Sequence, residues 1–287
     1  MGDLTGILNV NKPRGWTSHD VVARVRKLAG QRRVGHAGTL DPLAEGVLPV
    51  LLGRATRLAE FVQSGSKVYR AVVKLGEATE TDDAEGETVS TKPVQELSES
   101  LLQQTLARFH GEILQTPPKY SALKVDGRRA YAVARSGADV LLAPRPVTIH
   151  DLRLLDWRAN KLSLEVTCSK GTYIRALARD IAIALGTLGH LTTLIRTKVG
   201  PFELGDALSP DELASTGVDS AIVPASAALA DSPGYTATSD EAARLANGQA
   251  LPANGLHAEH VWVYDPSGLL VCLASADGTL LRPRIAL

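Results

Sequence analysis

The segment GHAGTLDP at residues 35–42 places one carboxylate, Asp41, among two glycines, a histidine and a threonine. A carboxylate in such a loop can cap a helix, bind a metal ion or react with a substrate. Capping fits the local pattern, because an Asp followed by Pro42 suits an N-cap with proline at the first helical position. Glycines also allow a tight backbone that presents a small side chain to a ligand. The loop alone leaves the role of Asp41 open.

Other reactive arrangements are incomplete elsewhere in the chain. Residues 30–37 have the spacing of a phosphate-binding Walker loop, but His36 and Ala37 replace its lysine and its hydroxyl residue. The acidic run at 77–87 does not follow the order of a calcium-binding loop, and a solvated turn is the favoured interpretation. The histidines are dispersed, with no pair at metal-binding spacing. We therefore expect neither a nucleotide hydrolase nor a metal site.

Composition indicates a globular protein with segregated charge. The 287 residues are 44% hydrophobic and 22% charged, which suits one large domain plus a small one. No apolar run approaches the roughly 20 residues that span a bilayer, no signal-peptide pattern is present, and only two cysteines occur, so we expect a cytoplasmic protein. Net charge is zero, yet residues 1–75 carry 12 Lys/Arg against 5 Asp/Glu, and residues 101–204 carry 15 against 8. Such blocks either concentrate positive potential on one face or are solvated surface.

Periodicity predicts the elements that must position these residues. Thr17 and Asp20 approximate a capping box before a helix at 18–29, which Gly30 ends. Because strands and helices mix without a regular βαβ repeat, we expect an α+β fold with a mixed, largely antiparallel sheet flanked by helices. The other expected elements are half-buried strands at 67–76 and 162–169, a helix or buried strand at 47–52, helices at 95–109, 129–136 and 173–185, and a β-hairpin around residues 266–268.

Four further segments are distinctive in sequence and lie along the chain in the following order: NKPRGWTSHDVV (11–22), KVYRAVVKLGEATETDDAEGE (67–87), PPKYSALKVDGRRAYAVAR (117–135) and SKGTYIRALARDI (169–181). Together with GHAGTLDPLAEGVLPV they closely resemble the motifs of TruB-type tRNA pseudouridine synthases. Several long motifs in register make the resemblance specific. It implies a catalytic domain at 1–232 with a basic RNA-contacting insertion at 117–145, and a small, mostly β, PUA-like domain at 233–287.

The resemblance also implies a reaction. Such enzymes isomerise the uridine at position 55 in the T-arm loop of tRNA, without cofactor or metal: the bond from N1 to the ribose breaks, the uracil turns, and C5 bonds to C1′. Asp41 is the implied catalytic residue, which attacks C1′, attacks C6 or removes a proton on the way to a glycal. Each route starts from an ionised carboxylate, whose unperturbed pKa is about 3.9. A buried carboxylate needs a cationic partner, and the motifs assign Arg175 to that role.

Further roles follow from the same motifs. Tyr69 stacks on the target base and serves as the late base at C5, although alternation alone makes it a core aromatic. Tyr173 lines the uracil pocket together with Leu194, which lies in a further matching segment, HLTTLIRTKVG (190–200). His36 fills the space that the flipped nucleotide leaves. The residues that support the catalytic loop are Lys12, Pro13, Gly35, Gly38 and Thr39. The residues that contact tRNA phosphates are Lys119, Lys124, Arg128, Arg129 and Arg135.

Two other functions remain open. An RNA chaperone that remodels the tRNA arm needs the same basic surface, with catalysis incidental. A nucleoside hydrolase also uses a carboxylate at C1′ but releases free uracil. The region 205–287 carries 3 Lys/Arg against 10 Asp/Glu, so we do not expect strong RNA affinity from it. We expect a monomer with tRNA as its partner.

Overall fold

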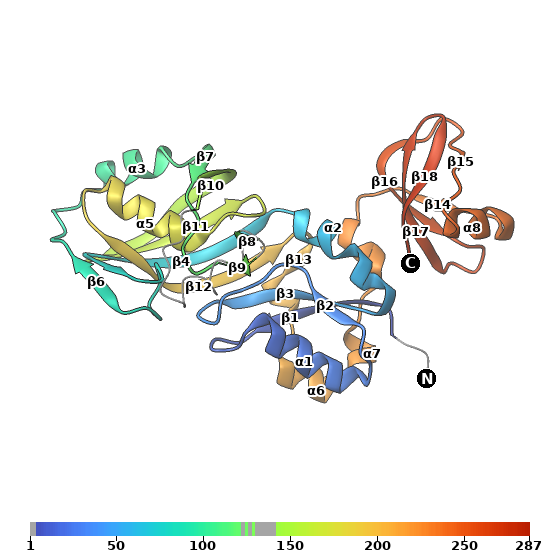
Figure 1. Cartoon of the computed structure of the whole chain (residues 1–287), viewed down its shortest axis with the longest axis horizontal. Helices are drawn as coiled ribbons and strands as arrows, with labels where there is room; N and C mark the ends of the chain where they lie inside the picture. Colours follow the sequence, from blue (N-terminus) through green and yellow to red (C-terminus); the bar gives the residue numbers. More distant parts are fainter. Residues whose placement is uncertain (1–3, 122–123, 126–127, 130–141) are drawn as a thin grey trace.

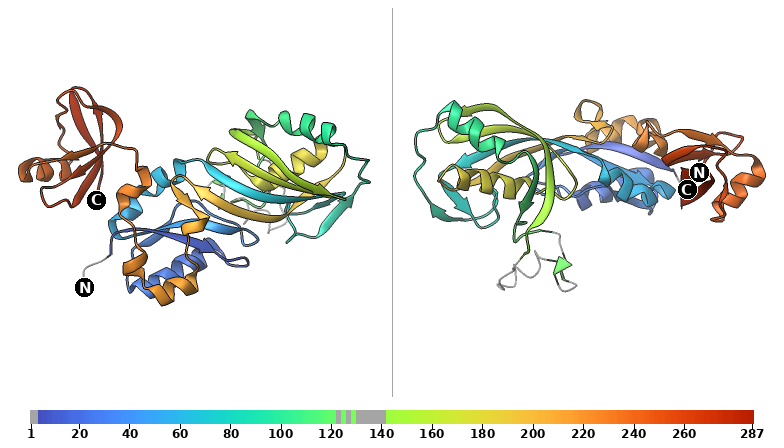
Figure 2. Two further views of the ribbon diagram at one scale, coloured as in Figure 1. Left: turned by 180° about the vertical axis from the view of Figure 1, so that it is seen from behind. Right: turned by 90° about the horizontal axis from the view of Figure 1, so that it is seen from above.

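The computed structural model describes residues 4–121, 124–125, 128–129 and 142–287. The chain forms an elongated molecule with one large sheet and one smaller sheet (Figures 1 and 2). The smaller sheet lies at the end of the molecule where both termini are found. Helices and strands mix in both parts without a regular alternation. The expected α+β class is confirmed.

The large sheet contains nine described strands, with β2 paired to β3, β13 paired to β12, and the others in the order β1-β3-β12-β4-β11-β10-β7. Of its pairings, β12 with β3 is parallel and the others are antiparallel. The strands are β1 (Gly6–Lys12), β2 (Val34–His36), β3 (Glu45–Leu52), β4 (Lys67–Leu75), β7 (Gly111–Gln115), β10 (Arg145–Arg158), β11 (Lys161–Cys168), β12 (Gly189–Val199) and β13 (Phe202–Glu203). Two short hairpins lie outside it: β5 (Glu77–Thr79) with β6 (Thr88–Thr91), and β8 (Lys124–Val125) with β9 (Arg128–Arg129).

The alternating sequences at 67–76 and 162–169 form strands, as predicted, and both strands lie inside the sheet. In β4, every second side chain from Lys67 to Leu75 is buried, while Arg70 on the other face is exposed. Strand β4 lies between β12 and β11, so its buried face packs into the main core. The run at 47–52, for which the sequence allowed helix or strand, belongs to β3 and is fully buried. A continuous apolar run of this length does not reveal its period, which explains the ambiguity.

The helices follow their capping signals. Helix α1 (Ser18–Ala29) begins with the predicted capping box of Thr17 and Asp20 and ends at Gly30, whose φ is +63°. Helix α3 (Glu99–Ala107) begins later than predicted, because the Ser98 side chain caps it, and α5 (Ile174–Ala184) matches its expected span. The predicted helix at 129–136 is wrong at Arg129, which lies in β9, and its remainder is outside the described residues. The other helices of this part are η1 (Gly53–Leu58), α2 (Ala59–Ser64), η2 (Leu204–Asp206), α6 (Pro210–Thr216), α7 (Val218–Ala221) and η3 (Ala225–Leu229).

Two groups of helices flank the large sheet (Figure 1). Helices α3 and α5 lie beside β10, β11 and β12. Helices α1, α6 and α7 pack against one another beside β1 and β2. Strands β4 and β12 therefore run through the middle of the sheet, between the two groups.

The smaller sheet has the order β14-β16-β17-β18-β15. The predicted hairpin around residues 266–268 is confirmed, since β16 and β17 are antiparallel and the Asp265 carboxylate accepts hydrogen bonds in the turn. Trp262 of this sheet shares a core with Ile7 of the large one. The division of the chain at residue 232 stays a prediction. The elements are β14 (Gly234–Thr236), α8 (Ser239–Ala246), β15 (Leu251–Pro252), β16 (His257–Tyr264), β17 (Leu270–Asp277) and β18 (Leu280–Ala286).

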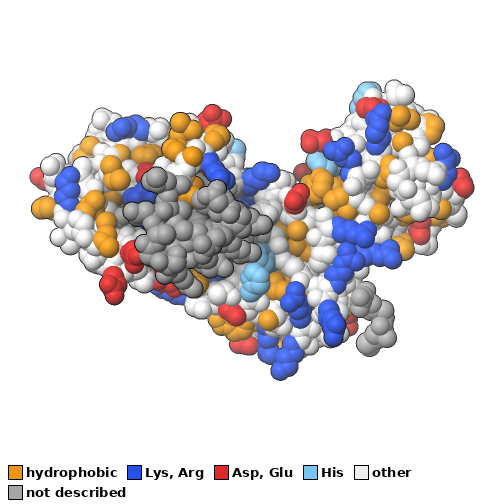
Figure 3. All heavy atoms as spheres, viewed as in Figure 1, with side chains coloured by type: hydrophobic (Ala, Val, Ile, Leu, Met, Phe, Trp, Pro, Cys, Tyr) orange, Lys and Arg blue, Asp and Glu red, His pale blue; other side chains and the backbone are white. Residues whose placement is uncertain are grey.

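Two arginines of η1, the helix that follows β3, join the end of the chain to the larger part of the molecule. Arg54 Nη1 donates to the Leu287 carbonyl at 2.9 Å, and Arg57 Nη1 donates to the Ala286 carbonyl at 2.8 Å. Figure 3 shows Lys and Arg side chains gathered where the small sheet meets the rest of the molecule. On the same view, positive and negative side chains are mixed over the small sheet itself.

The parallel contact between β3 and β12 requires a glycine at position 46. The φ of Gly46 is +102°, and a Cβ there would lie 2.2 Å from the carbonyl oxygen of Arg196. Because a backbone atom cannot move aside, we expect Gly46→Ala to lower the free energy of unfolding by at least ~2 kcal/mol in urea titrations. The control is Gly205→Ala, where a Cβ meets nothing within 4 Å. Equal stability of the two variants would contradict this close contact.

Candidate active site

The loop that carries Asp41 connects β2 to β3 and is fixed by its neighbours. Gly38 has a φ of +97°, and its carbonyl accepts a hydrogen bond from Arg196 Nη2 at 3.0 Å. The Leu40 N–H donates to Ser18 Oγ at 2.9 Å, at the start of α1. A turn and then strand β3 follow Asp41. The helix-capping interpretation of Asp41 is therefore wrong, because no helix begins there.

Lys12 supports this loop from inside the protein. It is fully buried, and its Nζ donates to the carbonyl oxygens of Trp16, Pro13 and Pro42 at 2.6, 3.0 and 3.4 Å. Burial lowers its pKa to about 8, while the negative charge of Asp41 acts in the opposite direction. Lys12 and Pro13 thus lie at the base of the loop, outside the cavity described next. Gly35 lies in β2, where a Cβ would meet one methyl group at 3.9 Å, so the space there does not require glycine.

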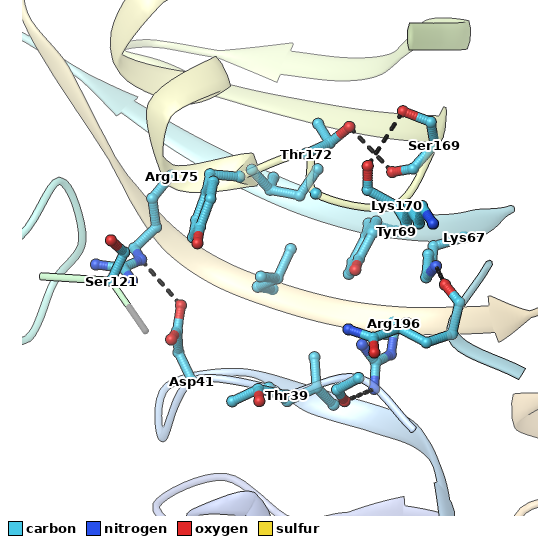
Figure 4. A pocket seen from close by; sticks show the side chains of 17 residues that line it. Thr39, Asp41, Lys67, Tyr69, Ser121, Ser169, Lys170, Thr172, Arg175 and Arg196 are labelled. Carbon is cyan, nitrogen blue, oxygen red and sulfur yellow. Dashed lines mark hydrogen bonds and ion pairs between the residues drawn. The ribbon is translucent and has the colours of Figure 1, made fainter. Parts of the chain in front are cut away.

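A cavity of about 220 Å³ opens beside the loop (Figure 4). Its wall comes from the Asp41 loop, from strands β4 and β12, and from the turn that leads into α5. Seven of the residues that the sequence predicted for the site meet here: Gly38, Thr39, Asp41, Tyr69, Tyr173, Arg175 and Leu194. Segments far apart along the chain therefore converge on one small space.

Asp41 and Arg175 form an ion pair in this cavity, with Arg175 Nε 2.9 Å from Asp41 Oδ2. The Nε–H direction does not meet hydrogen-bond geometry, so the contact is a charge pair rather than a hydrogen bond. The Arg175 side chain is 6% exposed, whereas Asp41 is 38% exposed. The remaining guanidinium nitrogens donate to the carbonyls of Thr81 and Tyr120, each at 2.9 Å. Arg175 is thus a fixed, buried cation.

The sequence did not anticipate a second carboxylate beside Arg175. Asp83 Oδ2 lies 3.5 Å from Arg175 Nε, and its side chain is 4% exposed. Thr81 Oγ1 donates to Asp83 Oδ1 at 2.5 Å, and the Glu85 N–H donates to the same oxygen at 3.0 Å. Next to it, Asp82 pairs with Arg179 at 2.8 Å. The solvated-turn interpretation of the acidic run is therefore wrong for these two aspartates, which neutralise arginines of α5.

Two tyrosines and a leucine line the cavity. Tyr69 is 8% exposed and Leu194 is 6% exposed, so both belong to the core as well as to the cavity wall. Burial raises the pKa of the phenols of Tyr69 and Tyr173, which keeps them protonated near neutral pH. The buried Gln115 holds the backbone of Tyr173, accepting from its N–H at 2.8 Å and donating to its carbonyl at 3.2 Å.

Sequence reasoning missed two buried cations of the cavity, Lys67 and Arg196. Each is two residues from a residue that was predicted, so a strand period of two places Lys67 on the face of Tyr69 and Arg196 on the face of Leu194. Arg196 also pairs with Tyr69 in the register of β12 and β4. The alternation alone could have predicted both residues on the buried face. A charged side chain among apolar ones is instead easily mistaken for the point where the alternation stops.

His36 lies outside the cavity, at the end of β2. Its ring contacts the His19 ring edge to face, with centroids 5.7 Å apart. Burial and the nearby positive charges lower its pKa to about 4, so the ring is neutral at physiological pH. A wider cleft, lined by His19, Asp41 and Arg175 among others, adjoins the cavity. Asp41 and Arg175 therefore stand where the cleft meets the cavity.

The basic stretch predicted to contact RNA is described only in part. Lys119 is exposed and is not part of the cavity wall. Lys124, Arg128 and Arg129 lie in the hairpin of β8 and β9. Arg135 is outside the described residues.

Comparison with known proteins identifies the family in which this arrangement occurs. The family model described as "TruB family pseudouridylate synthase (N terminal domain)" matches residues 26–174. The chain is 46% identical to the tRNA pseudouridine synthase B of Arthrobacter sp. (strain FB24), over 98% of this chain and 95% of that protein. The chain belongs to the TruB family. Pseudouridine synthases convert uridine to pseudouridine, so this TruB-family enzyme is an isomerase. The resemblance seen in the sequence is confirmed.

Other relatives and solved structures agree. The tRNA pseudouridine synthase B of Thermobifida fusca (strain YX) is 45% identical, over 94% of each chain. Among solved structures, a Cbf5–Nop10–Gar1 complex matches with a TM-score of 0.72 and 28% identity, over 96% of this chain and 79% of that one. An H/ACA RNP bound to a substrate RNA containing 2′-deoxyuridine matches with a TM-score of 0.73 and 25% identity, over 98% and 84%. None of the helices in the described parts of the chain is long and apolar enough to cross a membrane.

Proposed function

We propose that this TruB-family enzyme isomerises the uridine at position 55 in the T-arm loop of tRNA, with Asp41 as its essential catalytic carboxylate. The observation that carries the proposal is the Asp41–Arg175 ion pair, which stands at the border between an open cleft and a small, partly aromatic cavity. A nucleotide flipped out of a folded arm needs such a path from a wide entrance to a confined site. The relatives named tRNA pseudouridine synthase B support tRNA as the substrate.

Asp41 has the exposure and the partner that the reaction requires. Its carboxylate attacks C1′ as the C1′–N1 bond breaks, or adds to C6, or removes the C2′ proton to give a glycal. In each route C5 then bonds to C1′, the C5 proton leaves and N1 takes up a proton, so the molecular formula of the RNA is unchanged. Arg175 fixes the orientation of the Asp41 carboxylate, because its buried guanidinium lies 2.9 Å away and attracts the carboxylate by charge.

The cavity wall supplies the contacts to the base. Tyr69, Tyr173 and Leu194 provide flat and apolar surfaces on which a uracil can stack and turn. For Tyr69 to remove the C5 proton, its phenol must first lose its own proton. Burial opposes this loss, while the charge of Arg196 favours it. We assign His36 to the space vacated by the nucleotide, since its neutral ring can stack without a charge to desolvate.

RNA binding is assigned to the basic residues outside the cavity. Lys119 and the β8–β9 hairpin, with Lys124, Arg128 and Arg129, are proposed to contact phosphates, which fix the register of the arm without reading its sequence. We propose that the enzyme acts as a monomer and in the cytoplasm, and that the catalytic part ends near residue 232, where the smaller PUA-like sheet follows.

The proposal is tested with tRNA transcripts labelled with [5-³H]uridine. We expect release of about one tritium per tRNA, because C5 loses its hydrogen when it bonds to C1′. A transcript with cytidine at position 55 should release none. The mass of the tRNA should not change. Free uracil in the supernatant would indicate a nucleoside hydrolase instead. Tight tRNA binding without tritium release would favour the RNA chaperone function.

A further inference from the structure

The catalytic cavity has a cationic end away from the Asp41–Arg175 ion pair. Three cations line it besides Arg175: Lys67, Lys170 and Arg196. Among the described residues, none of the three forms an ion pair with a carboxylate, and Asp41 is the single carboxylate in the cavity wall. Figure 4 shows Asp41 and Arg175 on one side and Lys67 and Arg196 on the other, with Tyr69 between. The charges in the cavity wall are therefore unevenly distributed: Asp41 and Arg175 neutralise each other at one end, and the positive charges of Lys67 and Arg196 lie beyond Tyr69.

Lys67 is buried and has no carboxylate partner among the residues that the structure describes, and burying an unpaired charge is costly. Its side chain lies at the start of β4 and the residue is 5% exposed. The ammonium donates to the carbonyl oxygens of Gln63 and Gly65, the second at 2.7 Å. An ammonium has three donors, so one remains for a ligand in the cavity that Lys67 lines. Burial and the charge of Arg196 lower its pKa to about 8, which leaves it mainly charged at neutral pH.

Arg196 is held beside it by the catalytic loop. The residue is 2% exposed, Nε donates to the Val47 carbonyl at 2.7 Å, and Nη2 donates to the Gly38 carbonyl at 3.0 Å. The guanidinium is thus fixed in place before any substrate binds, and its charge lies near the Tyr69 hydroxyl. These two hydrogen bonds join Arg196 to the Asp41 loop and to β3, the strand that follows it. They therefore link the position of the guanidinium to the position of the Asp41 carboxylate.

The chemistry of isomerisation supplies an anion for this end. When the C1′–N1 bond breaks, its electron pair leaves with the uracil, and the charge spreads over N1, O2 and O4. When Asp41 instead adds to C6, the electron pair of the C5–C6 double bond moves to O4. In every route the pyrimidine gains the negative charge that Asp41 gives up when its carboxylate becomes an ester or an acid. Preorganised donors aimed at developing charge are the usual means of stabilising such a state.

We propose that Lys67 and Arg196 form an anion site that stabilises the pyrimidine oxygens while the uracil is detached from, or activated on, its ribose. This inference rests on the proposed function, because it concerns the same cavity and the same reaction. It assigns the two buried cations a part in the chemical step, distinct from RNA affinity. It also accounts for a detached base that stays inside the enzyme: the cationic end holds the oxygens while C5 turns towards C1′.

The test compares two target bases in single-turnover reactions of Lys67→Met. One tRNA carries uridine at the target position and the other carries 5-fluorouridine, and conversion is followed by the disappearance of the N-linked nucleoside after digestion. For uridine we expect the rate to fall by ~10²–10³-fold, the usual loss for one preorganised donor. Fluorine withdraws electrons and stabilises the pyrimidine anion by itself. The loss with 5-fluorouridine should therefore be ~10-fold or less.

The matched control is Lys198→Met, a lysine on strand β12 whose ammonium pairs with Glu203 outside the cavity. Its rates on both bases should equal those of the wild type. Lys67→Arg should recover most of the uridine rate, because it restores a cation. An equal loss on both bases, or a Lys67→Met rate like that of the control, would overturn the anion site.

Two further readouts keep the test decisive. Because Lys67 also satisfies two carbonyl oxygens, Lys67→Met can fail to fold; Lys67→Gln then replaces it, since an amide still donates to those oxygens but carries no charge. Thermal unfolding of each variant shows which one folds and is used.

The wild-type reaction separates this inference from the proposed function. If the wild type converts the uridine tRNA and the variant loses rate equally on both bases, the anion site is contradicted and the proposed function stands. If the wild type does not convert the uridine tRNA, both proposals are contradicted.

Discussion

Asp41→Asn is expected to abolish pseudouridine formation while leaving tRNA binding intact. Asparagine keeps the shape of the side chain but has no electron pair basic enough to attack the sugar or the base, or to take up a proton. We expect single-turnover tritium release to fall by at least ~10⁴-fold, in the range typical of removing an essential nucleophile or base. The dissociation constant for tRNA should stay within ~3-fold, since phosphate contacts elsewhere set most of the affinity.

The fold should survive this substitution. Arg175 loses one charged partner but keeps Asp83 at 3.5 Å and its two backbone carbonyls. An exposed aspartate on α7, Asp219, provides the matched control as Asp219→Asn. Activity of the Asp41 variant within ~10-fold of this control would show that another group performs the chemistry. Loss of tRNA binding together with activity would mean that Asp41 acts through the structure of its loop.

Elements with local signals could be predicted from the sequence. The helix at 18–29 depends on a capping box within four residues and on a glycine with positive φ, and both are readable without tertiary information. Strand β4 was equally clear, because one face is buried and the other is not, which gives strict alternation. The late start of α3 shows the limit, since several residues before Ser98 are also compatible with a helix and the cap decides among them.

Long-range pairs could not be predicted in the same way. Asp82 and Asp83 look like part of a solvated acidic run, yet their partners, Arg179 and Arg175, lie more than ninety residues later on α5. The Asp41 capping hypothesis failed for the same reason, because the loop leads into a strand that is specified by pairing with β1 and β12. The residues of the acidic turn and of α5 are brought together by the sheet, not by spacing.

The site residues that were predicted are those to which the family motifs assign a role. Asp41, Tyr69 and Arg175 were found through resemblance and do meet in one cavity. Asp83, Lys67 and Arg196 lie in or beside the same motifs, but their chemistry depends on burial, which a single sequence does not reveal. A buried charge is recognised by the absence of solvent around it, and that is a property of the packed structure.

The Arg175–Asp83 contact leads to the second large effect: Arg175→Met should lose both activity and stability. Methionine removes the cation between two carboxylates and leaves Asp83, 4% exposed, without its charge partner. Removing one member of a buried pair costs about 3–5 kcal/mol, which urea unfolding would measure. Catalysis should fall by at least ~10³-fold, because Asp41 loses the cation that orients its carboxylate.

The double variant Arg175→Met, Asp83→Asn separates the two roles of the arginine. If the stability loss comes from an uncompensated buried carboxylate, removing that carboxylate should restore at least ~1 kcal/mol, so the two substitutions are strongly non-additive. Activity should not return, since Asp41 still lacks its cation. Recovery of activity in the double variant would mean that Arg175 serves only to neutralise Asp83. Additive losses of stability would mean that Asp83 is held by Thr81 and the Glu85 N–H rather than by the charge of Arg175.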